Sequence, residues 1–242
     1  MKLIYTLLAI SLSGCAAIDT EMNHSQLNVT SKMSDSIFLE PTSPRKHIVY
    51  VSVKNTTDQD LSGIGTEIKQ EFRNAGWKVT NDPDRAYNML QVNVLQAGQA
   101  KDPDTVWKSV QSGYGALLLG GLAGVATGYL TNSTGAGIAV GALVGVGSWV
   151  ADSMIKDVTY SIITDIQVSV KAKGVHQSTA SNLRQGNSTI EYQSHSKTSN
   201  WQHYRARIAT VADQANLKFE TAKPKLIHQL AKETTGIFIS QD

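Results

Sequence analysis

The side chains that most often carry out catalysis or bind metal ions are few and dispersed in this sequence. Cys15 is the single cysteine, so the chain cannot supply the pair of thiolates that many zinc sites use. No H-E-x-x-H, G-x-S-x-G or G-x-x-x-x-G-K-[ST] pattern occurs. We therefore expect no catalytic residues, no metal site and no bound cofactor. An enzymatic activity would require residues whose spacing in the sequence does not reveal that they form a site. The six histidines are expected to be solvated or to lie on strand surfaces: His24, His47, His176, His195, His203 and His228.

Cys15 is the one reactive group that lies in a recognisable local pattern. It follows a charged start (MK) and an apolar run over residues 3–12, which are typical of a secretory signal and too short to span a bilayer. The sequence LSGC that ends at Cys15 resembles the lipobox of bacterial lipoproteins, in which the cysteine becomes the first residue and carries acyl chains. A lone cysteine in an exported chain could otherwise be a free thiol or form an intermolecular disulfide. We predict a lipoprotein signal peptide over residues 1–14, with S-diacylglycerol and N-acyl (palmitate) chains on Cys15.

Acyl chains on Cys15 would anchor the protein to a membrane. Each methylene group that enters the lipid contributes about 0.8 kcal/mol, so several chains together hold a protein firmly. Ala16 and Ala17 follow the cysteine, and Asp19 comes only later. By resemblance to other lipoproteins, the lack of an Asp directly after the cysteine implies delivery to the outer membrane. Lipid of the outer membrane is therefore the first expected partner.

A stretch without charged residues runs from Gly113 to Val150 and holds eleven of the nineteen glycines. Glycine destabilises a water-exposed helix by about 1 kcal/mol relative to alanine, so this composition does not suit a helix in water. Two arms flank the polar turn TNSTG, and glycine recurs every fourth residue in each arm, as in the G-x-x-x-G pattern of packed membrane helices. We predict a membrane-associated helical hairpin over residues 113–151 that packs against other copies of the chain. Its contact positions are Gly120, Gly124, Gly128, Gly137, Gly141 and Gly145.

The length of the arms leaves open whether the hairpin crosses the membrane. From Tyr114 to Leu130 the first arm has 17 residues, which is about 26 Å as a helix, against a hydrocarbon core of about 30 Å. Tyr114, Tyr129 and Trp149 fall near the arm ends, where membrane interfaces favour aromatic rings. The alternatives are a plug between subunits, a hairpin buried in a soluble fold and a flexible loop. The abundance of Leu, Val and Ala disfavours the loop.

The segments that flank this stretch predict one domain of class α/β, more finely α+β. Residues 15–46 are mostly polar and indicate a lipidated N-terminal tether. By their alternation and helical periodicity, residues 47–112 indicate a βαββ half, and residues 152–242 a βββα half. Ser62 is placed to cap the first helix and Gly76 to end it, whereas Pro224 either begins the regular part of the last helix or kinks it. We expect the two halves to form one sheet-and-helix domain, interrupted by the hairpin.

Six segments of the chain, in order, resemble the TraT lipoproteins of conjugative plasmids, and they cover nearly all of the mature sequence. The resemblance implies an outer-membrane lipoprotein that is exposed at the cell surface and forms a large homo-oligomer. It also implies surface (entry) exclusion, in which a plasmid-bearing cell becomes a poor recipient for related donors, and a contribution to complement (serum) resistance. The family has no catalytic residues to transfer, and only Cys15 corresponds to a known functional position. The segments are the lipobox, MSDSIFLEP (33–41), DPDRAYNMLQVNVLQA (82–97), MIKDVTYSIITDIQV (154–168), NLRQG (182–186) and NLKFETAKPKLIHQLAK (216–232), with the glycine-rich stretch between the third and fourth.

The charge balance and the resemblance together define the expected partners. The net charge is only +2 and the basic residues are scattered, so we expect no binding to nucleic acid. The resemblance implies a homo-oligomeric ring, contact with pilus or mating-pair proteins of the donor cell, and contact with complement components. We expect an oligomeric surface interaction module without catalysis. The alternative is an oligomeric pore or a transport or secretion lipoprotein, although the lack of charged residues between Lys108 and Asp152 disfavours a water-filled channel.

Overall fold

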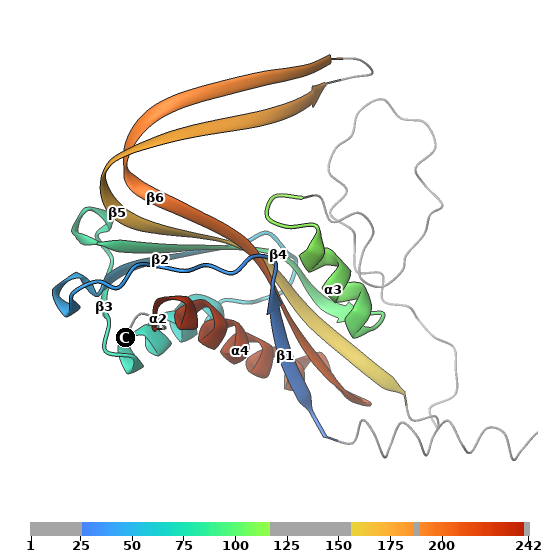
Figure 1. Cartoon of the computed structure of the whole chain (residues 1–242). Coiled ribbons are helices and arrows are strands. Elements are labelled where there is room, and N and C mark those ends of the chain that lie inside the picture. The colour runs from blue at the N-terminus through green and yellow to red at the C-terminus, as the bar shows by residue number, and fades with distance from the viewer. Residues whose placement is uncertain (1–25, 117–155, 186–188, 240–242) are drawn as a thin grey trace, which may run out of the picture.

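The computed structural model describes residues 26–116, 156–185 and 189–239 (Figure 1). They form a six-stranded mixed sheet with the strand order β1-β6-β5-β4-β2-β3, accompanied by three α-helices. This arrangement confirms the α+β fold class. The elements are β1 (Asn28–Met33), η1 (Pro44–Lys46), β2 (Ile48–Asn55), α2 (Gly63–Asn74), β3 (Lys78–Thr80), η2 (Pro83–Arg85), β4 (Asn88–Ala100), α3 (Pro103–Gln111), β5 (Asp157–Gln185), β6 (Thr189–Ala215) and α4 (Phe219–Ile239).

The sheet combines a parallel part and an antiparallel part. β2 pairs in parallel with β3 and β4, and α2 provides the long connection that parallel neighbours need. β5 pairs antiparallel with β4 and β6, and β6 pairs antiparallel with β1. The pairing of β4 with β5 ends at Val170, whereas β5 and β6 stay paired as far as Gln185 and Thr189. These two strands therefore continue beyond the sheet as a two-stranded arm (Figure 1).

Helices cover both faces of the sheet. α2 and α4 pack on one face and enclose the main core, to which α2 contributes the apolar side chains Ile64, Ile68 and Phe72. α3 lies on the other face over a smaller cluster. The neighbouring residues Ile162 and Ile163 of β5 are both fully buried but belong to different clusters, because successive side chains of a strand point to opposite faces. The central strands are therefore covered on both sides.

The first strand lies in the segment for which we expected a polar tether. β1 pairs with β6 from Asn28 opposite Asp213 to Met33 opposite Ile208. Its exposure alternates along the strand, and Val29 and Met33 pack against the main core. The apolar residues of this segment are sparse because an edge strand with one solvated face needs only every second side chain to be apolar. Residues 28–33 are thus part of the sheet.

Two local expectations were wrong, and one helix was missed. The second half contains two long strands where we expected three, because no Gly or Pro interrupts β6 between Thr189 and Ala215. Ser62 makes no side-chain cap; instead its amide donates to the Asp60 carboxylate at 3.1 Å. α3 was not expected at all. By contrast, Gly76 follows α2 with φ 80, as its predicted role at the helix end requires. Pro224 lies inside α4, so the helix begins before it.

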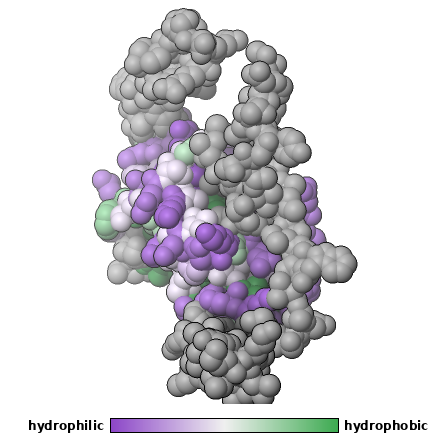
Figure 2. All heavy atoms as spheres, turned by 90° about the vertical axis from the view of Figure 1, so that its right-hand side faces the viewer, coloured by the Kyte–Doolittle hydropathy of each residue, from purple (hydrophilic) through white to green (hydrophobic). Residues whose placement is uncertain are grey.

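None of the helices within the described ranges is both long and apolar enough to cross a membrane. Figure 2 views the molecule from the right-hand side of Figure 1. Where the described residues are visible on this face, hydrophilic side chains predominate.

Candidate functional site at the root of the glycine-rich segment

A buried ion pair joins the central strands β5 and β6. Arg207 lies directly opposite Asp165 in the antiparallel register. The Nε of Arg207 donates to Oδ1 of Asp165 at 2.7 Å, and its Nη2 donates to Oδ2 at 3.2 Å. The side chain of Arg207 is 0% exposed and that of Asp165 is 8% exposed. A charge is costly to bury unless it is fully paired, so each of these side chains depends on the other.

The remaining hydrogen bonds of this pair hold the chain that leaves α3. Arg207 Nη1 donates to Ser112 Oγ at 2.9 Å, and Nη2 donates to the carbonyl of Ala116 at 2.8 Å. The Oδ2 of Asp165 accepts a hydrogen bond from the amide of Gly115 at 2.8 Å. One guanidinium and one carboxylate thus attach this turn to the sheet. Ala116 is the last described residue before the gap that ends at Lys156.

Two glycines shape the turn itself. Gly113 has φ 76 and Gly115 has φ 72, a conformation that strains any residue with a Cβ atom. Nothing lies within 4 Å of a Cβ placed at either glycine, so the backbone conformation and not the available space requires glycine. Tyr114 lies between them, 42% exposed, with the Arg205 guanidinium 5.3 Å from its ring centroid. Tyr114 and Gly115 lie in a turn and Ala116 is not helical, so the expected first arm is not helical at these three residues; the rest of the expected hairpin lies outside the described residues.

α3 leads the chain into this turn. The carboxylate of Asp102 caps the helix by accepting a hydrogen bond from the amide of Thr105 at 2.6 Å. The hydrogen bonds from Thr105 hold the pKa of Asp102 below its usual range. Farther along the helix, Lys32 of β1 places its Nζ 4.6 Å from the ring centroid of Trp107. α3 is therefore connected both to the smaller core and to the N-terminal edge strand.

The chain rejoins the sheet at a separate place. The amide of Lys156 donates to Oδ1 of Asn216 at 3.2 Å, and the amide of Asn216 donates to the carbonyl of Lys156 at 2.8 Å. Asn216 has φ 55, a left-handed conformation that asparagine tolerates better than most residues. Asp157, the first residue of β5, lies eight residues before Asp165, a separation of roughly 26 Å along a strand. The two ends of residues 117–155 are therefore fixed far apart on the same strand pair.

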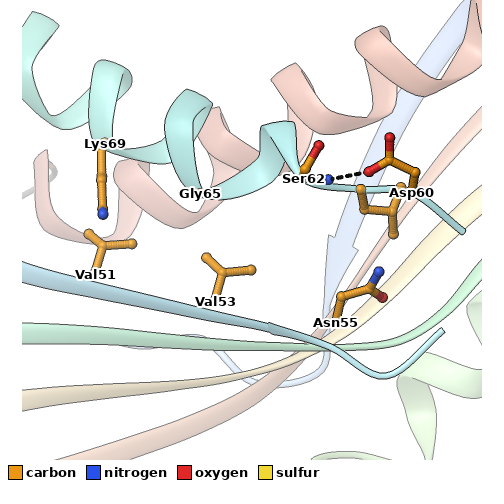
Figure 3. Close-up of a pocket in the computed structure, with 8 residues that line it drawn as sticks. Val51, Val53, Asn55, Asp60, Ser62, Gly65 and Lys69 are labelled. Carbon is orange, nitrogen blue, oxygen red and sulfur yellow. Dashed lines mark hydrogen bonds between the residues drawn. The ribbon is translucent and has the colours of Figure 1, made fainter.

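The two outer edges of the sheet are incompletely paired. β1 has a strand neighbour only on the side of β6. β2 pairs with β4 as far as Asn55 but with β3 only as far as Tyr50. A groove of 440 Å³ lies between this outer part of β2 and α2, with Val51 and Val53 directed toward the helix near Gly65 (Figure 3). Within the described ranges, the last residues of β2 thus have no strand on their outer side.

A serine and a histidine meet on β5 and β6, but their placement indicates a structural role. Ser169 Oγ and His203 Nδ1 are 2.7 Å apart, and the two residues are register partners. Ser169 is 1% exposed, so its hydroxyl has no open path to a substrate. Burial, together with the nearby charge of Arg205, lowers the pKa of His203. This pair therefore stabilises the strands instead of forming an accessible nucleophile.

Comparison with known proteins identifies the family. The model of the family described as "Enterobacterial TraT complement resistance protein" matches residues 26–238. The chain belongs to the TraT family. The TraT complement resistance protein of Escherichia coli strain K12 is 38% identical to it over 231 residues, which cover 94% of this chain and 93% of that protein. A TraT complement resistance protein of Wigglesworthia glossinidia brevipalpis is 32% identical over 99 residues, 41% of each chain.

Among solved structures, a PelC dodecamer from Paraburkholderia phytofirmans aligns with 86% of this TraT-family chain and 97% of its own. The identity is 9% and the TM-score 0.31, so we draw nothing from this likeness.

The expected lipid-attachment residue and the expected glycine contact positions of this TraT-family chain lie outside the described ranges. This applies to the lipid-attachment residue Cys15 and to the expected contact positions Gly120, Gly124, Gly128, Gly137, Gly141 and Gly145. Their roles stay predictions.

Sequence reasoning missed Asp165, Arg207 and the turn that they hold. The signal was present: each charged residue interrupts an apolar strand segment, ITDIQV and ARIATV, and ionic side chains are rarely buried unless they are paired. Opposite charges in two neighbouring strands suggest such a pair. The register that brings Asp165 opposite Arg207 could not be obtained from the sequence, because a shift of one residue would face them to opposite sides of the sheet.

Proposed function

We propose that this chain is a lipid-anchored, self-assembling protein of the outer membrane that contributes to complement resistance and to surface exclusion of conjugative plasmids. The family match over residues 26–238 carries the proposal. It is supported by relatives that are themselves named complement resistance proteins. The lipobox cysteine Cys15 and the two alanines after it support attachment to the outer membrane. The protein would act by occupying the cell surface, where it hinders complement assembly or the contact with a donor cell, and not by catalysis.

The root of the glycine-rich segment supports assembly through that segment. One end of the segment is attached at Asp165 and the other leads into Asp157, and these two residues lie roughly 26 Å apart along β5, whereas two helices in contact lie about 8–10 Å apart. Arms that start from such distant points can meet the arms of neighbouring copies without first turning toward each other. This geometry favours the expected packing of glycine faces between copies over a closed hairpin within one copy.

The length of the segment favours packing between copies over crossing of the membrane. Since no helix can begin before Leu117, an arm that ends at Leu130 would have at most 14 residues. Such a helix is about 21 Å long, against a hydrocarbon core of about 30 Å. The lipid on Cys15 would then provide the membrane attachment, and the arms would insert partly or join subunits.

The edges of the sheet offer a second contact between copies. β1 is open on one side and the end of β2 is open on the other. Pairing of the first edge with the second edge of the next copy would be a head-to-tail contact, which closes into a ring when the rotation per subunit permits. This support is independent of the glycine-rich segment.

Transfer of conjugative plasmids into cells that produce this protein tests surface exclusion. Recipients carrying the wild-type gene are mated with a panel of donors whose plasmids belong to different groups. The matched control carries Cys15→Ser, which removes the acyl chains and leaves the described domain unchanged. We expect wild-type recipients to take up at least one plasmid less often than the control recipients. Equal uptake from every donor would contradict the exclusion role.

A further inference from the structure

Two carboxylates and an imidazole meet on the exposed surface between α2 and α4. Glu67 and Glu71 lie one turn apart on α2, and His228 lies on the adjacent helix α4. The Nδ1 atom of His228 is 2.8 Å from Oε1 of Glu67 and 3.9 Å from Oε1 of Glu71. One potential ligand atom from each of the three residues lies within 4.8 Å of the other two. The cluster is on the helical layer opposite α3, away from the root of the glycine-rich segment.

In the part of the chain that the structure describes, no lysine or arginine forms an ion pair with this cluster. Within the described ranges, the ion pairs of Glu67 and Glu71 are with His228 alone. The two carboxylates lie at i and i+4 on one helix, where like charges repel. The side chain of His228 is 49% exposed, so an ion from solution can reach the cluster. A bound cation would relieve the repulsion between the two glutamates.

The donor atoms suit a transition metal of the zinc class. Oε1 of Glu67 lies 2.8 Å from Nδ1 of His228, and a carboxylate oxygen can only accept a hydrogen bond. Nδ1 is therefore the donor of this hydrogen bond. A metal ion would take the place of that proton and leave Nδ1 as a nitrogen ligand beside two oxygens. Zinc binds such nitrogen and oxygen sets, whereas calcium and magnesium prefer oxygen ligands alone and in larger number.

The observed distances fit tetrahedral coordination. Ligand atoms about 2.0–2.2 Å from a tetrahedral zinc ion lie about 3.4 Å from one another. The distances of 2.8 and 3.9 Å from Nδ1 to the two carboxylate oxygens lie on either side of this value. Small rotations of the partly exposed Glu side chains and of His228 would therefore complete the arrangement, and water would take the fourth position. The backbones need not move, because α2 and α4 are already packed through Ile64, Ile68 and Leu226 of the main core.

We propose that Glu67, Glu71 and His228 form a surface site for a zinc-class metal ion that ties α2 to α4. The inference does not depend on complement resistance or surface exclusion, because it rests only on the geometry between these helices. It assigns His228 a role that its spacing in the sequence does not indicate, since its partners are about 160 residues away in the chain.

Zinc titration of the full-length mature protein tests the site. The protein is purified in detergent without a histidine tag and treated with a chelator, which is then removed. Zinc binding is measured by competition with a chromogenic indicator for the wild type, His228→Gln and Glu71→Gln. Glu220→Gln serves as the matched control, because Glu220 is an exposed carboxylate in the first turn of the same helix as His228. Circular dichroism checks that each variant is folded.

We expect one zinc ion per chain at this site and a rise in Tm of the wild type with zinc concentration. His228→Gln and Glu71→Gln should each weaken binding by about 10-fold or more, because loss of a group that directly holds the metal costs at least as much as loss of a group that only orients a ligand. Glu220→Gln should bind like the wild type, and excess magnesium should not displace zinc. Absence of zinc binding, or binding that folded His228→Gln retains in full, would overturn the proposal.

Discussion

Arg207 and Asp165 face each other across β6 and β5, and the same two side chains hold the backbone of Ala116 and Gly115. The glycine-rich segment is thus attached to the centre of the sheet and not to a flexible rim. The attachment uses both members of a buried ion pair. Breaking it would therefore either expose a charge to solvent or leave a buried charge without its partner. This relationship links the stability of the domain to the position from which the segment starts.

Arg207→Met should strongly destabilise the domain. Removal of one partner leaves the carboxylate of Asp165 buried without its counter-charge, which costs about 3–5 kcal/mol. The matched control is Arg205→Met, two residues earlier on the same strand, because Arg205 is exposed and its interactions are worth about 1 kcal/mol or less. The free energy of unfolding by urea, measured in the same detergent for both variants, checks this difference. An equal loss of unfolding free energy in both variants would contradict a stabilising role of the Arg207–Asp165 pair.

Substitution by alanine should have opposite effects on stability at Gly115 and at Gly65. Gly115→Ala forces a Cβ atom into a left-handed conformation and should destabilise the protein by about 1 kcal/mol. Gly65→Ala, inside α2, should be neutral or stabilise it by up to about 1 kcal/mol, because its Cβ would meet Val53 at an ordinary 3.6 Å. Thermal unfolding of the two variants measures the effects. A lower Tm for Gly65→Ala than for Gly115→Ala would contradict the description of the turn.

Stability should fall when the pH drops below about 6.5, the ordinary pKa of histidine. Burial and Arg205 lower the pKa of His203 in the folded protein, so the unfolded chain takes up the proton first. Protonation therefore favours unfolding, and the loss begins at the unfolded pKa and ends at the lower folded pKa. The pH dependence of unfolding of the wild type and His203→Gln, compared between pH 5 and 8, checks the sign. The free energy of unfolding of His203→Gln should depend less on pH in this range than that of the wild type. The same pH dependence in both proteins would exclude His203 as the source of the loss.

The fold class was accessible from the sequence because the buried strands and α2 keep their periodicity over many residues. Ile64, Ile68 and Phe72 recur at helical spacing, and all three are fully buried. β1 was missed because a half-buried edge strand needs few apolar residues. α3 was missed because only its short buried face, Val106 and Val110, carries the pattern.

The candidate site could be inferred only in part. The glycine-rich stretch and Cys15 are visible in composition and in local spacing. The attachment of the stretch depends on Asp165 and Arg207, which are 42 residues apart in the chain and meet only through the register of β5 and β6. The same limit applies to His228 and Glu67, because a contact between distant helices leaves no trace in the spacing of either segment.

Replacement of glycines in both arms should break the assembly of copies. Gly124→Leu combined with Gly141→Leu would fill the small-residue faces through which helices approach closely. Val125→Leu is the matched control, because it enlarges a side chain in the first arm at a position that is not one of the expected glycine contacts. Native electrophoresis of the detergent extracts should show smaller particles for the glycine variant and wild-type particles for the control. Particles of unchanged size in the glycine variant would exclude these positions as the contact.

Survival of cells in serum is the most direct test of the proposed complement resistance. Cells that produce equal amounts of the wild type, Cys15→Ser or the double glycine variant are exposed to active serum and to heat-inactivated serum, which lacks complement activity. We expect the wild type to raise survival in active serum, both variants to lose this advantage, and the three strains to survive equally in inactivated serum. Survival of the wild-type strain no better than that of cells without the gene would contradict the complement role. Full protection by the unlipidated or unassembled variants would contradict a lipid-anchored assembly as its cause.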